Sequence, residues 1–315
     1  MDVAFIRVNS SYRDLIVIAT IALGLVFSQP TLADDLIGMQ TTYETRAEDT
    51  LPDIARRFDL GYVEIRTSNP NVDPWLPGAG NWLTLPTQHI LPRATRRGIV
   101  INLPELRLYY FLSDREVLTF PIGIGKEGYE TPLGSTTIKR KRMHPTWVPT
   151  ASAHAETPGL PAQVPPGPDN PMGELALYLG WPGYAIHGTD KPYSIGRRDS
   201  HGCIRLYPQD IDALFSTVPV GTPVTVVNEP VKAGWSAGEL YIEVHPYEGD
   251  ADNIEIDGKA STPVTIDADD IITTVAGDAA ERVDWDAVEK AKKERKGIPL
   301  RITLPSGQTS NLKPD

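Results

Sequence analysis

Residues 184–206 read Y-A-I-H-G-T-D-K-P-Y-S-I-G-R-R-D-S-H-G-C-I-R-L, and the rest of the chain is arranged around this stretch. It contains Cys203, the only cysteine in 315 residues. The cysteine follows a Ser-His-Gly run at 200–202, and a second histidine, His187, closes an apolar run sixteen residues earlier. A thiol near histidines and a glycine-bearing turn predicts a nucleophile. The alternative is a buried structural cysteine, since free cysteine often behaves as a small core residue.

The composition is that of a globular chain built from short strands and turns. Hydrophobic residues make up 40% of the chain, which leaves room for two or three small domains. The 29 prolines and 26 glycines favour strands and turns over long helices. The net charge of −11 argues against nucleic acid as a partner and against docking on an anionic membrane, because both need a basic surface.

The first 33 residues have the pattern of a secretory signal peptide. Arg7 and Arg13 precede a thirteen-residue apolar core at 15–27, and small residues at 31–33 suit a cleavage site. The alternative is a retained membrane anchor, but a span needs about 20 apolar residues. Export would place the chain where cysteines normally pair as disulfides. A lone exported cysteine is a liability unless the protein uses it.

Residues 40–91 form a first compact unit. The expected elements are a strand at 42–45, a helix to Phe58 capped by Asp49 or Thr50, a helix at 62–67 and a strand at 81–86. This βααβ unit resembles a LysM module, which implies binding of N-acetylglucosamine polymers. The matching residues are Asp49-Thr50-Leu51, Ile54 to Phe58, Asn69-Pro70 and Leu83 to Pro86. The alternative is a packing domain without a ligand.

From Gly98 onward the chain reads as strands. Strands are expected at 99–103, 106–111, 117–122, 135–139, 176–179, 185–187 and 224–227, with a helix at 208–215. Many short strands separated by turns indicate a sandwich or a closed sheet. Residues 229–315 form a small α+β C-terminal extension of unknown role. Its expected elements are a helix at 285–294 with Asp284 as N-cap and a strand at 300–304.

Three further segments bear on function. The G-x-G-x-x-G run at 123–128 lacks a following helix and a later acid, which excludes dinucleotide binding. The acidic run at 250–252 lacks the later ligands of a calcium loop, so we expect a solvated acidic loop there. We expect the proline-rich run at 149–173 to form no hydrogen-bonded strand ladder of its own. Its expected role is that of a spacer, or of a wall or lid of the substrate cleft.

The chemistry that the central stretch supports is acyl transfer. A neighbouring imidazole can take the proton of a thiol and leave a thiolate–imidazolium pair. Gly202 permits a tight turn before Cys203, and the amides of that turn can hold an oxyanion. A zinc site built from His187, His201 and Cys203 is the alternative, although it offers only three ligands.

At these residues the chain resembles a known family. His187-Gly188 followed by Ser200-His201-Gly202-Cys203-Ile204-Arg205 is similar to the signature of the L,D-transpeptidases, bacterial enzymes that cross-link peptidoglycan. Further matching residues are 121–125, 131–134, 145–147, 166–171 and 186–188. The resemblance implies a mainly β, β-sandwich-like catalytic domain at 96–228, without cofactor or metal, in the periplasm.

The family's residue roles carry over by motif position. The resemblance implies Cys203 as nucleophile and His187 as general base and then acid. It implies that Ser200 and His201 orient the His187 ring, partly through their backbone carbonyls. Gly202 and Cys203 would supply oxyanion-hole amides, and Gly188 and Arg205 would contact the substrate. The implied donor is the meso-diaminopimelate carbonyl of a stem tetrapeptide, which forms a thioester and releases D-alanine.

The acceptor stays open at this point. Many family members carry Asn where this chain has Arg205, and Arg is typical of a Gram-negative subgroup that anchors the envelope. Arg205 therefore favours the C-terminal lysine of an outer-membrane lipoprotein as the acceptor. The other possible acceptor amine is that of a second diaminopimelate. The alternatives are hydrolysis at the same site, as a carboxypeptidase or endopeptidase, and a non-catalytic wall-binding protein.

Overall fold

The computed structural model describes residues 34–113, 116–263, 268–305 and 308. The expected signal peptide at 1–33 lies outside these residues. Within them, no helix is both long and apolar enough to cross a membrane.

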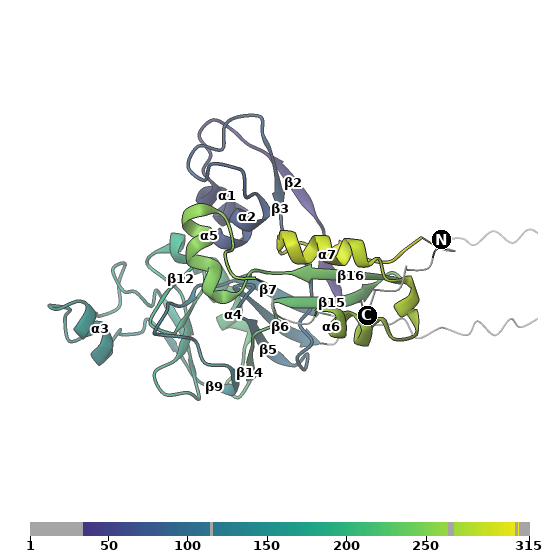
Figure 1. Cartoon of the computed structure of the whole chain (residues 1–315). Helices are drawn as coiled ribbons and strands as arrows, with labels where there is room; N and C mark the ends of the chain where they lie inside the picture. Colours follow the sequence, from purple (N-terminus) through teal and green to yellow (C-terminus); the bar gives the residue numbers. More distant parts are fainter. Residues whose placement is uncertain (1–33, 114–115, 264–267, 306–307, 309–315) are drawn as a thin grey trace, which may run out of the picture. The chain divides into compact units, whose positions relative to one another are not determined.

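A mixed sheet of eight strands forms the centre of the described chain (Figure 1). Its strand order is β13-β11-β10-β9-β14-β5-β6-β7, with parallel pairs at β13/β11 and β14/β5. The strands are β5 (Gly98–Asn102), β6 (Arg107–Ser113), β7 (Glu116–Pro121), β9 (Gly134–Met143), β10 (Leu175–Leu179), β11 (Ala185–His187), β13 (Ile204–Arg205) and β14 (Pro223–Val227). The expected mainly β architecture is confirmed.

The sheet curls around one helix, α4 (Pro208–Thr217). Ile211 and Leu214 of this helix share a core with apolar residues of both ends of the sheet, among them Leu108 of β6 and Leu177 of β10. Apolar side chains leave water when the sheet wraps the helix, which drives the curvature. The facing surfaces that the sequence suggested as a sandwich therefore belong to a single curled sheet.

Residues 36–90 contain two short strand pairs and two helices. Their elements are β1 (Leu36–Gly38), β2 (Thr41–Glu44), α1 (Leu51–Arg57), α2 (Tyr62–Ser68), β3 (Trp82–Leu85) and β4 (Gln88–Ile90). Strand β2 pairs with β3, and β1 pairs with β4. Thr50, rather than Asp49, caps α1, because its hydroxyl accepts the Asp53 N–H at 3.3 Å.

Residues 231–302 build a small core of their own, except that Ala251 and Ile254 pack in the central core. Their elements are β15 (Val231–Ser236), β16 (Glu239–Val244), α5 (Ala251–Asp257), α6 (Ala268–Ala276), α7 (Trp285–Glu294) and β17 (Leu300–Arg301). The Asp284 carboxylate accepts the Ala287 N–H at 3.0 Å, which confirms the expected N-cap of α7. The last strand is shorter than expected, because only Leu300 and Arg301 pair with β16.

One local expectation was wrong, and one helix was not expected from the sequence. Asp250 is fully buried rather than solvated, because the amides and hydroxyls of Ser261 and Thr262 satisfy its carboxylate at 2.9–3.1 Å. The run at 149–173 holds a helix, α3 (Ala151–Glu156), which the Thr150 hydroxyl caps. Val164 also exchanges two backbone hydrogen bonds with Trp147, which precedes the run, in one isolated bridge.

A buried ionic network joins the three regions of the chain. Lys232 of β15 is fully buried, and its ammonium lies 2.8 Å from Glu105 and 3.0 Å from Glu243. Burial opposes the charge of Lys232, yet the two carboxylates hold its pKa above the ordinary value. A second buried pair connects Arg107 of β6 to Glu64 of α2 at 2.8 Å. The pairs Lys232–Glu105 and Arg107–Glu64 link residues that are far apart in the sequence, whereas Lys232 and Glu243 face each other across β15 and β16.

Candidate active site

Strands β11 and β13 bring the two motif halves together. They run parallel, with Ile186 opposite Ile204 and His187 opposite Arg205. Cys203, one residue before β13, therefore lies beside Ala185, whose amide hydrogen-bonds to the thiol. His187 and Cys203 line the same cleft. A parallel pair thus unites two residues that a long loop separates in sequence.

Ser200 and Gly202 shape the turn that presents the thiol. Gly202 has φ of +98°, and a Cβ there would lie 2.7 Å from the Tyr184 ring, so only glycine fits. The Ser200 hydroxyl accepts the Gly202 N–H at 3.1 Å and donates to the Cys203 carbonyl at 2.6 Å. Ser200 therefore orients the turn of the cysteine itself. The Gly202 amide already has a hydrogen-bond partner within this turn.

The carbonyl that holds the His187 ring belongs to Gly188. His187 is buried, and its Nδ1 lies 2.6 Å from the Gly188 oxygen. A carbonyl only accepts, so Nδ1 carries the proton and Nε2 is left as a base. Burial, together with the positive charge of Arg205, lowers the pKa of His187 to about 4. The imidazole is therefore neutral at physiological pH.

The thiol is neutral as well. The Cys203 Sγ lies 3.5 Å from the Gly183 carbonyl oxygen, which accepts its proton. Burial raises the pKa of Cys203 against smaller opposing effects of the Ala185 amide and Arg205. The thiolate–imidazolium pair that the residue types suggested is thus not the resting state. The burial that desolvates both groups favours their uncharged forms.

This resting state predicts how the thiol reacts with pH. Iodoacetamide should alkylate Cys203 slowly at pH 6, and the rate should rise about tenfold per pH unit through pH 8. The alkylated fraction is measured by intact mass, with glutathione as the reference thiol at each pH. A rate that stays level between pH 5 and pH 7 would indicate a thiolate–imidazolium pair and contradict this assignment.

The cleft around Cys203 has a volume of about 410 Å³. Its walls come from the central sheet, the catalytic turn and the run at 149–173, which confirms the cleft-wall expectation for that run. The lining residues are Arg140, Thr146, Trp147, Val148, Thr150, Ala153, Pro171, Met172, Tyr178, Gly183, Ala185, His187, Ser200, His201, Cys203 and Arg205. No aspartate or glutamate of the described residues lines it, although the whole chain has a net charge of −11.

His201 connects the catalytic turn to helix α3. Its Nε2 lies 2.9 Å from the Glu156 carboxylate, which also pairs with Lys126 at 2.7 Å. The Tyr129 ring meets the His201 ring edge-on, with the centroids 4.8 Å apart. Hydrogen bonds from Lys126, then Tyr129 and His201, hold the pKa of Glu156 well below its usual range. The His201 side chain thus fastens the cleft wall to the turn.

The loop between His187 and Cys203 is held by α2. The first-turn amides of α2 donate to this loop, Tyr62 to the Ile195 carbonyl at 3.3 Å and Val63 to the Gly196 carbonyl at 3.1 Å. Helix N-terminal amides otherwise lack partners, so the loop satisfies donors that the helix cannot. Gly196 has φ of +75°, and a Cβ there would lie 2.2 Å from the Tyr62 nitrogen. The N-terminal unit therefore supports the catalytic loop directly.

Helix α5 of the C-terminal extension holds the same loop. Arg197 of the loop pairs with Glu255 of α5, and its guanidinium lies 3.8 Å from the centre of the Tyr62 ring. Arg198 lies 3.5 Å from Glu248, just before α5. The loop that carries the nucleophile is thus fixed from both flanking regions.

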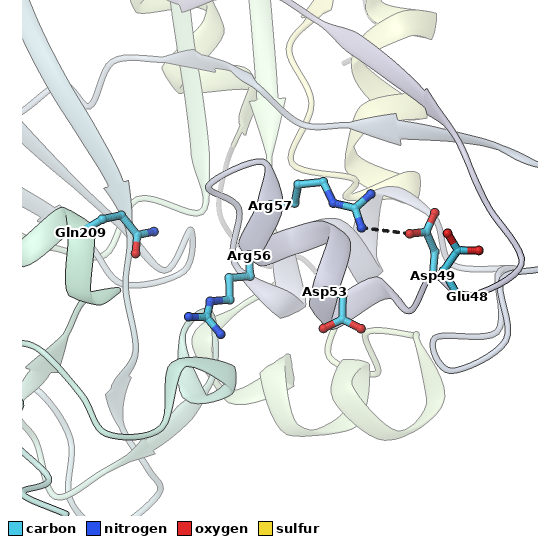
Figure 2. Close-up of a pocket in the computed structure, with 6 residues that line it drawn as sticks. All are labelled: Glu48, Asp49, Asp53, Arg56, Arg57 and Gln209. Atoms are coloured by element: carbon cyan, nitrogen blue, oxygen red, sulfur yellow. Dashed lines mark hydrogen bonds and ion pairs between the residues drawn. The ribbon is translucent and has the colours of Figure 1, made fainter. Parts of the chain in front are cut away.

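A separate hollow lies along α1 (Figure 2). Its lining residues are Glu48, Asp49, Asp53, Arg56, Arg57 and Gln209. Figure 2 shows the Arg57 guanidinium turned toward Asp49, and these groups are 3.1 Å apart. Asp53 accepts from the Tyr193 hydroxyl at 2.9 Å. These carboxylates are engaged within the protein, and the hollow lacks a thiol or histidine for acyl transfer.

The potential metal ligands lie elsewhere. Within the described ranges, one group of ligand atoms is close enough to hold an ion, that of His89, Glu105 and Glu243. Lys232 already places its ammonium between the two carboxylates. The residues therefore fit an internal ion pair better than a metal ion, since a cation is supplied by the chain.

Of the two predicted substrate contacts, Arg205 lines the cleft and Gly188 does not. Gly188 lies outside the cleft lining, with its amide bound to the Leu175 carbonyl at 3.1 Å. Arg205 lines the cleft and pairs with Asp199 at 3.2 Å. Motif reasoning missed Arg140 and Tyr178, because no local pattern shows which residues of β9 and β10 the register places in the cleft.

Comparison with known proteins identifies the domain. A family model described as the L,D-transpeptidase catalytic domain, YkuD, matches residues 96–226. The chain is 41% identical over 290 residues to the Escherichia coli protein named "Probable L,D-transpeptidase YbiS", covering 89% of this chain and 93% of that one. It is 39% identical over 297 residues to the E. coli protein named "Probable L,D-transpeptidase ErfK/SrfK", covering 91% and 94%.

A solved structure shows similarity over the central part of the chain. The catalytic domain of the Enterococcus faecium L,D-transpeptidase is 28% identical, with 43% of this chain and 100% of that chain covered and a TM-score of 0.35. The relatives from E. coli extend over most of the present chain and agree with the domain match. The protein therefore belongs to the L,D-transpeptidase family of enzymes.

Proposed function

We propose that Cys203 and His187 carry out the transpeptidation. The observation that supports this most strongly is the assignment of the His187 ring. Since Nδ1 donates to the Gly188 carbonyl, Nε2 is the ring nitrogen that we assign to take the proton of the thiol that lines the same cleft. The donor is a stem tetrapeptide, and the attacked group is the carbonyl of its diaminopimelate residue.

The reaction proceeds in two balanced steps. In the first, Sγ attacks the carbonyl carbon while Nε2 takes the thiol proton. The imidazolium then protonates the leaving amine, D-alanine departs and a thioester remains. In the second, the acceptor amine attacks the thioester, gives a proton through Nε2 and releases Cys203 as a thiol. A neutral resting pair suits this course, because no stable ion pair has to be dismantled before attack.

The developing oxyanion has two candidate donors in the catalytic turn. The Cys203 amide is one, and the Gly202 amide is the other. The Gly202 amide would exchange its present partner, the Ser200 hydroxyl, for the oxyanion. Ser200 keeps its bond to the Cys203 carbonyl, so the turn stays oriented during that exchange.

The acceptor that we favour is an amine, either a lipoprotein lysine or a second diaminopimelate. Arg205 at the cleft, where many family members have Asn, supports the lipoprotein. The similarity of the whole chain to the two E. coli relatives supports placement in the periplasm. Hydrolysis at the same site remains the second candidate, because only the attacking group differs.

The flanking regions have proposed roles as well. The unit at 40–91 would bind glycan as a LysM-like module, and two tryptophans on its surface support this. Trp75 is 60% exposed and Trp82 is 67% exposed, so both rings are available to stack on sugars. The extension at 229–315 would stabilise the catalytic loop through α5, as the Arg197–Glu255 pair suggests.

An incubation with purified muropeptides tests the proposed acceptor. The enzyme is given tetrapeptide monomers with and without a peptide that ends in lysine, and the products are resolved by liquid chromatography and mass spectrometry. We expect a lysine adduct when the peptide is present and cross-linked dimers without it. Trimmed monomers alone would assign a hydrolase, and unchanged monomers would contradict enzymatic activity on this donor. The Cys203→Ala protein is the matched control.

A further inference from the structure

We propose that Arg140 and Tyr178 form a subsite that binds a carboxylate of the donor stem peptide. This inference rests on the proposed function, because it takes the stem as the occupant of the cleft. It adds a recognition element that the catalytic motif does not contain. The ligand is a carboxylate that stays on the enzyme-bound half of the stem after D-alanine leaves.

The sheet aligns this subsite with the nucleophile. Arg140 of β9 lies directly opposite Tyr178 of β10, and Tyr178 lies opposite Ala185 of β11. Cys203 is next to Ala185, whose amide contacts the thiol. Residues directly opposite one another in a sheet project to the same face. All four therefore lie in one row across the floor of the cleft, and all four line it.

The Arg140 side chain is held while its donors stay available. Its guanidinium lies 4.1 Å from the centre of the Tyr178 ring, which fixes the plane of the fork without using its N–H groups. Arg140 is exposed, and among the described residues no carboxylate lies within ion-pair distance of it. Arg205, the other arginine of the cleft, already pairs with Asp199.

The charge of the cleft favours an anionic ligand. Among the residues that the structure describes, Arg140 has no ion-pair partner and no aspartate or glutamate lines the cleft, while the chain as a whole has a net charge of −11. Such a local concentration of positive charge on an acidic protein selects anionic groups. A planar guanidinium fork matches the two oxygens of a carboxylate.

The spacing indicates which carboxylate is bound. The backbone of Tyr178 is two strand spacings of about 4.8 Å from that of Cys203, which is about 10 Å, and the Arg140 guanidinium stacks on the Tyr178 ring. The carboxylate of the leaving D-alanine is only one residue from the attacked carbonyl, at most about 4 Å away. The carboxylate at the far end of the diaminopimelate side chain reaches further, and it remains after the first step.

The test combines an enzyme variant with a substrate variant. Thioester formation is followed by quenched flow and intact mass spectrometry. No acceptor is added, so that only the acylation of Cys203 by the donor is measured. The donors are a tetrapeptide stem with the free side-chain carboxylate of diaminopimelate and the same stem with that carboxylate amidated. We expect Arg140→Gln to lower kcat/KM for acylation by the free-carboxylate stem roughly 10- to 100-fold, mainly through KM. The amidated stem should react equally slowly with both proteins.

Three comparisons make the result decisive. Lys139→Gln removes the same charge from the neighbouring position, which is exposed and outside the cleft lining, and it should leave acylation unchanged. Arg140→Lys should recover only part of the loss, because lysine cannot reproduce the stacked fork. The thermal midpoint of each variant is measured, so that loss of folding is recognised.

The inference is wrong if Arg140→Gln reduces acylation by both stems equally, or by neither, in a folded protein. That outcome leaves the proposed function intact, since wild-type thioester formation is measured in the same experiment. Absence of the wild-type thioester with both stems would overturn the proposed function itself.

Discussion

Cys203→Ala is expected to abolish formation of the thioester with a tetrapeptide stem. Without Sγ the cleft has no thiol to attack the carbonyl, because Cys203 is the only cysteine of the chain. The loss should be at least about 10³-fold, as for the removal of other covalent nucleophiles. Intact mass spectrometry after incubation with muropeptides measures the acyl adduct directly.

The matched variants separate the two roles in the pair. Cys203→Ser keeps the shape of the turn but offers a poorer nucleophile, so it should fold normally and accumulate no adduct within the wild-type reaction time. His187→Gln keeps a side chain near Gly188 and removes the base, so acylation should fall by about 10²- to 10⁴-fold. If Cys203→Ala protein still gave the adduct, another residue would have to be the nucleophile.

Binding to the cell wall serves as the control for these variants. Sacculus binding should be the same for wild-type and Cys203→Ala protein, because the exposed Trp75 and Trp82 are remote from the thiol in sequence and are not part of the cleft lining. A protein that only binds wall would show no difference in muropeptide products between the two. The transpeptidase assignment predicts a complete difference.

Lys232→Met is expected to cause the largest loss of stability. Lys232 is fully buried and its ammonium compensates two buried carboxylates, Glu105 at 2.8 Å and Glu243 at 3.0 Å. Removing one member of a buried ionic group leaves charge without compensation, which typically costs about 3–5 kcal/mol. Chemical denaturation with urea, followed by tryptophan fluorescence and circular dichroism, measures the free energy of unfolding.

A surface lysine and a compensating variant complete the experiment. Lys296→Met removes an ion pair with Glu294 that lies on the surface at 3.1 Å, so the free energy of unfolding should change by less than about 1 kcal/mol. Adding Glu105→Gln and Glu243→Gln to Lys232→Met should recover part of the lost stability. A Lys232→Met protein as stable as Lys296→Met would show that the network contributes little.

The loss of stability in Lys232→Met is also expected to affect the active site. The same region of the chain that carries Lys232 continues into α5, which pairs with the loop between His187 and Cys203. We therefore expect Lys232→Met to slow acylation at temperatures where the protein is still mostly folded. The structure makes the extension part of the support of the catalytic loop.

Local sequence patterns were sufficient for many of the helices and strands. Strands at 99–103 and 224–227 and the Asp284 cap of α7 were predicted because neighbouring residues determine periodicity and capping. Helix α3 was missed, since nearby prolines and glycines hid a short helix that Thr150 caps. The solvated loop expected at Asp250 was wrong, because its partners Ser261 and Thr262 lie beyond a turn of chain.

The sequence by itself determined that Ser200, His201 and Gly202 stand directly before Cys203, because these four residues are contiguous, whereas the pairing of β11 with β13 brings His187 to them. Only the tertiary structure decided the protonation of the pair, since burial and Arg205 act on His187 from positions that no local pattern reveals. Only the tertiary structure placed Arg140 and Tyr178 in one row with the thiol, because that row depends on the register of β9, β10 and β11. Register and burial arise from packing between distant segments, and the free energy of that packing belongs to the whole fold.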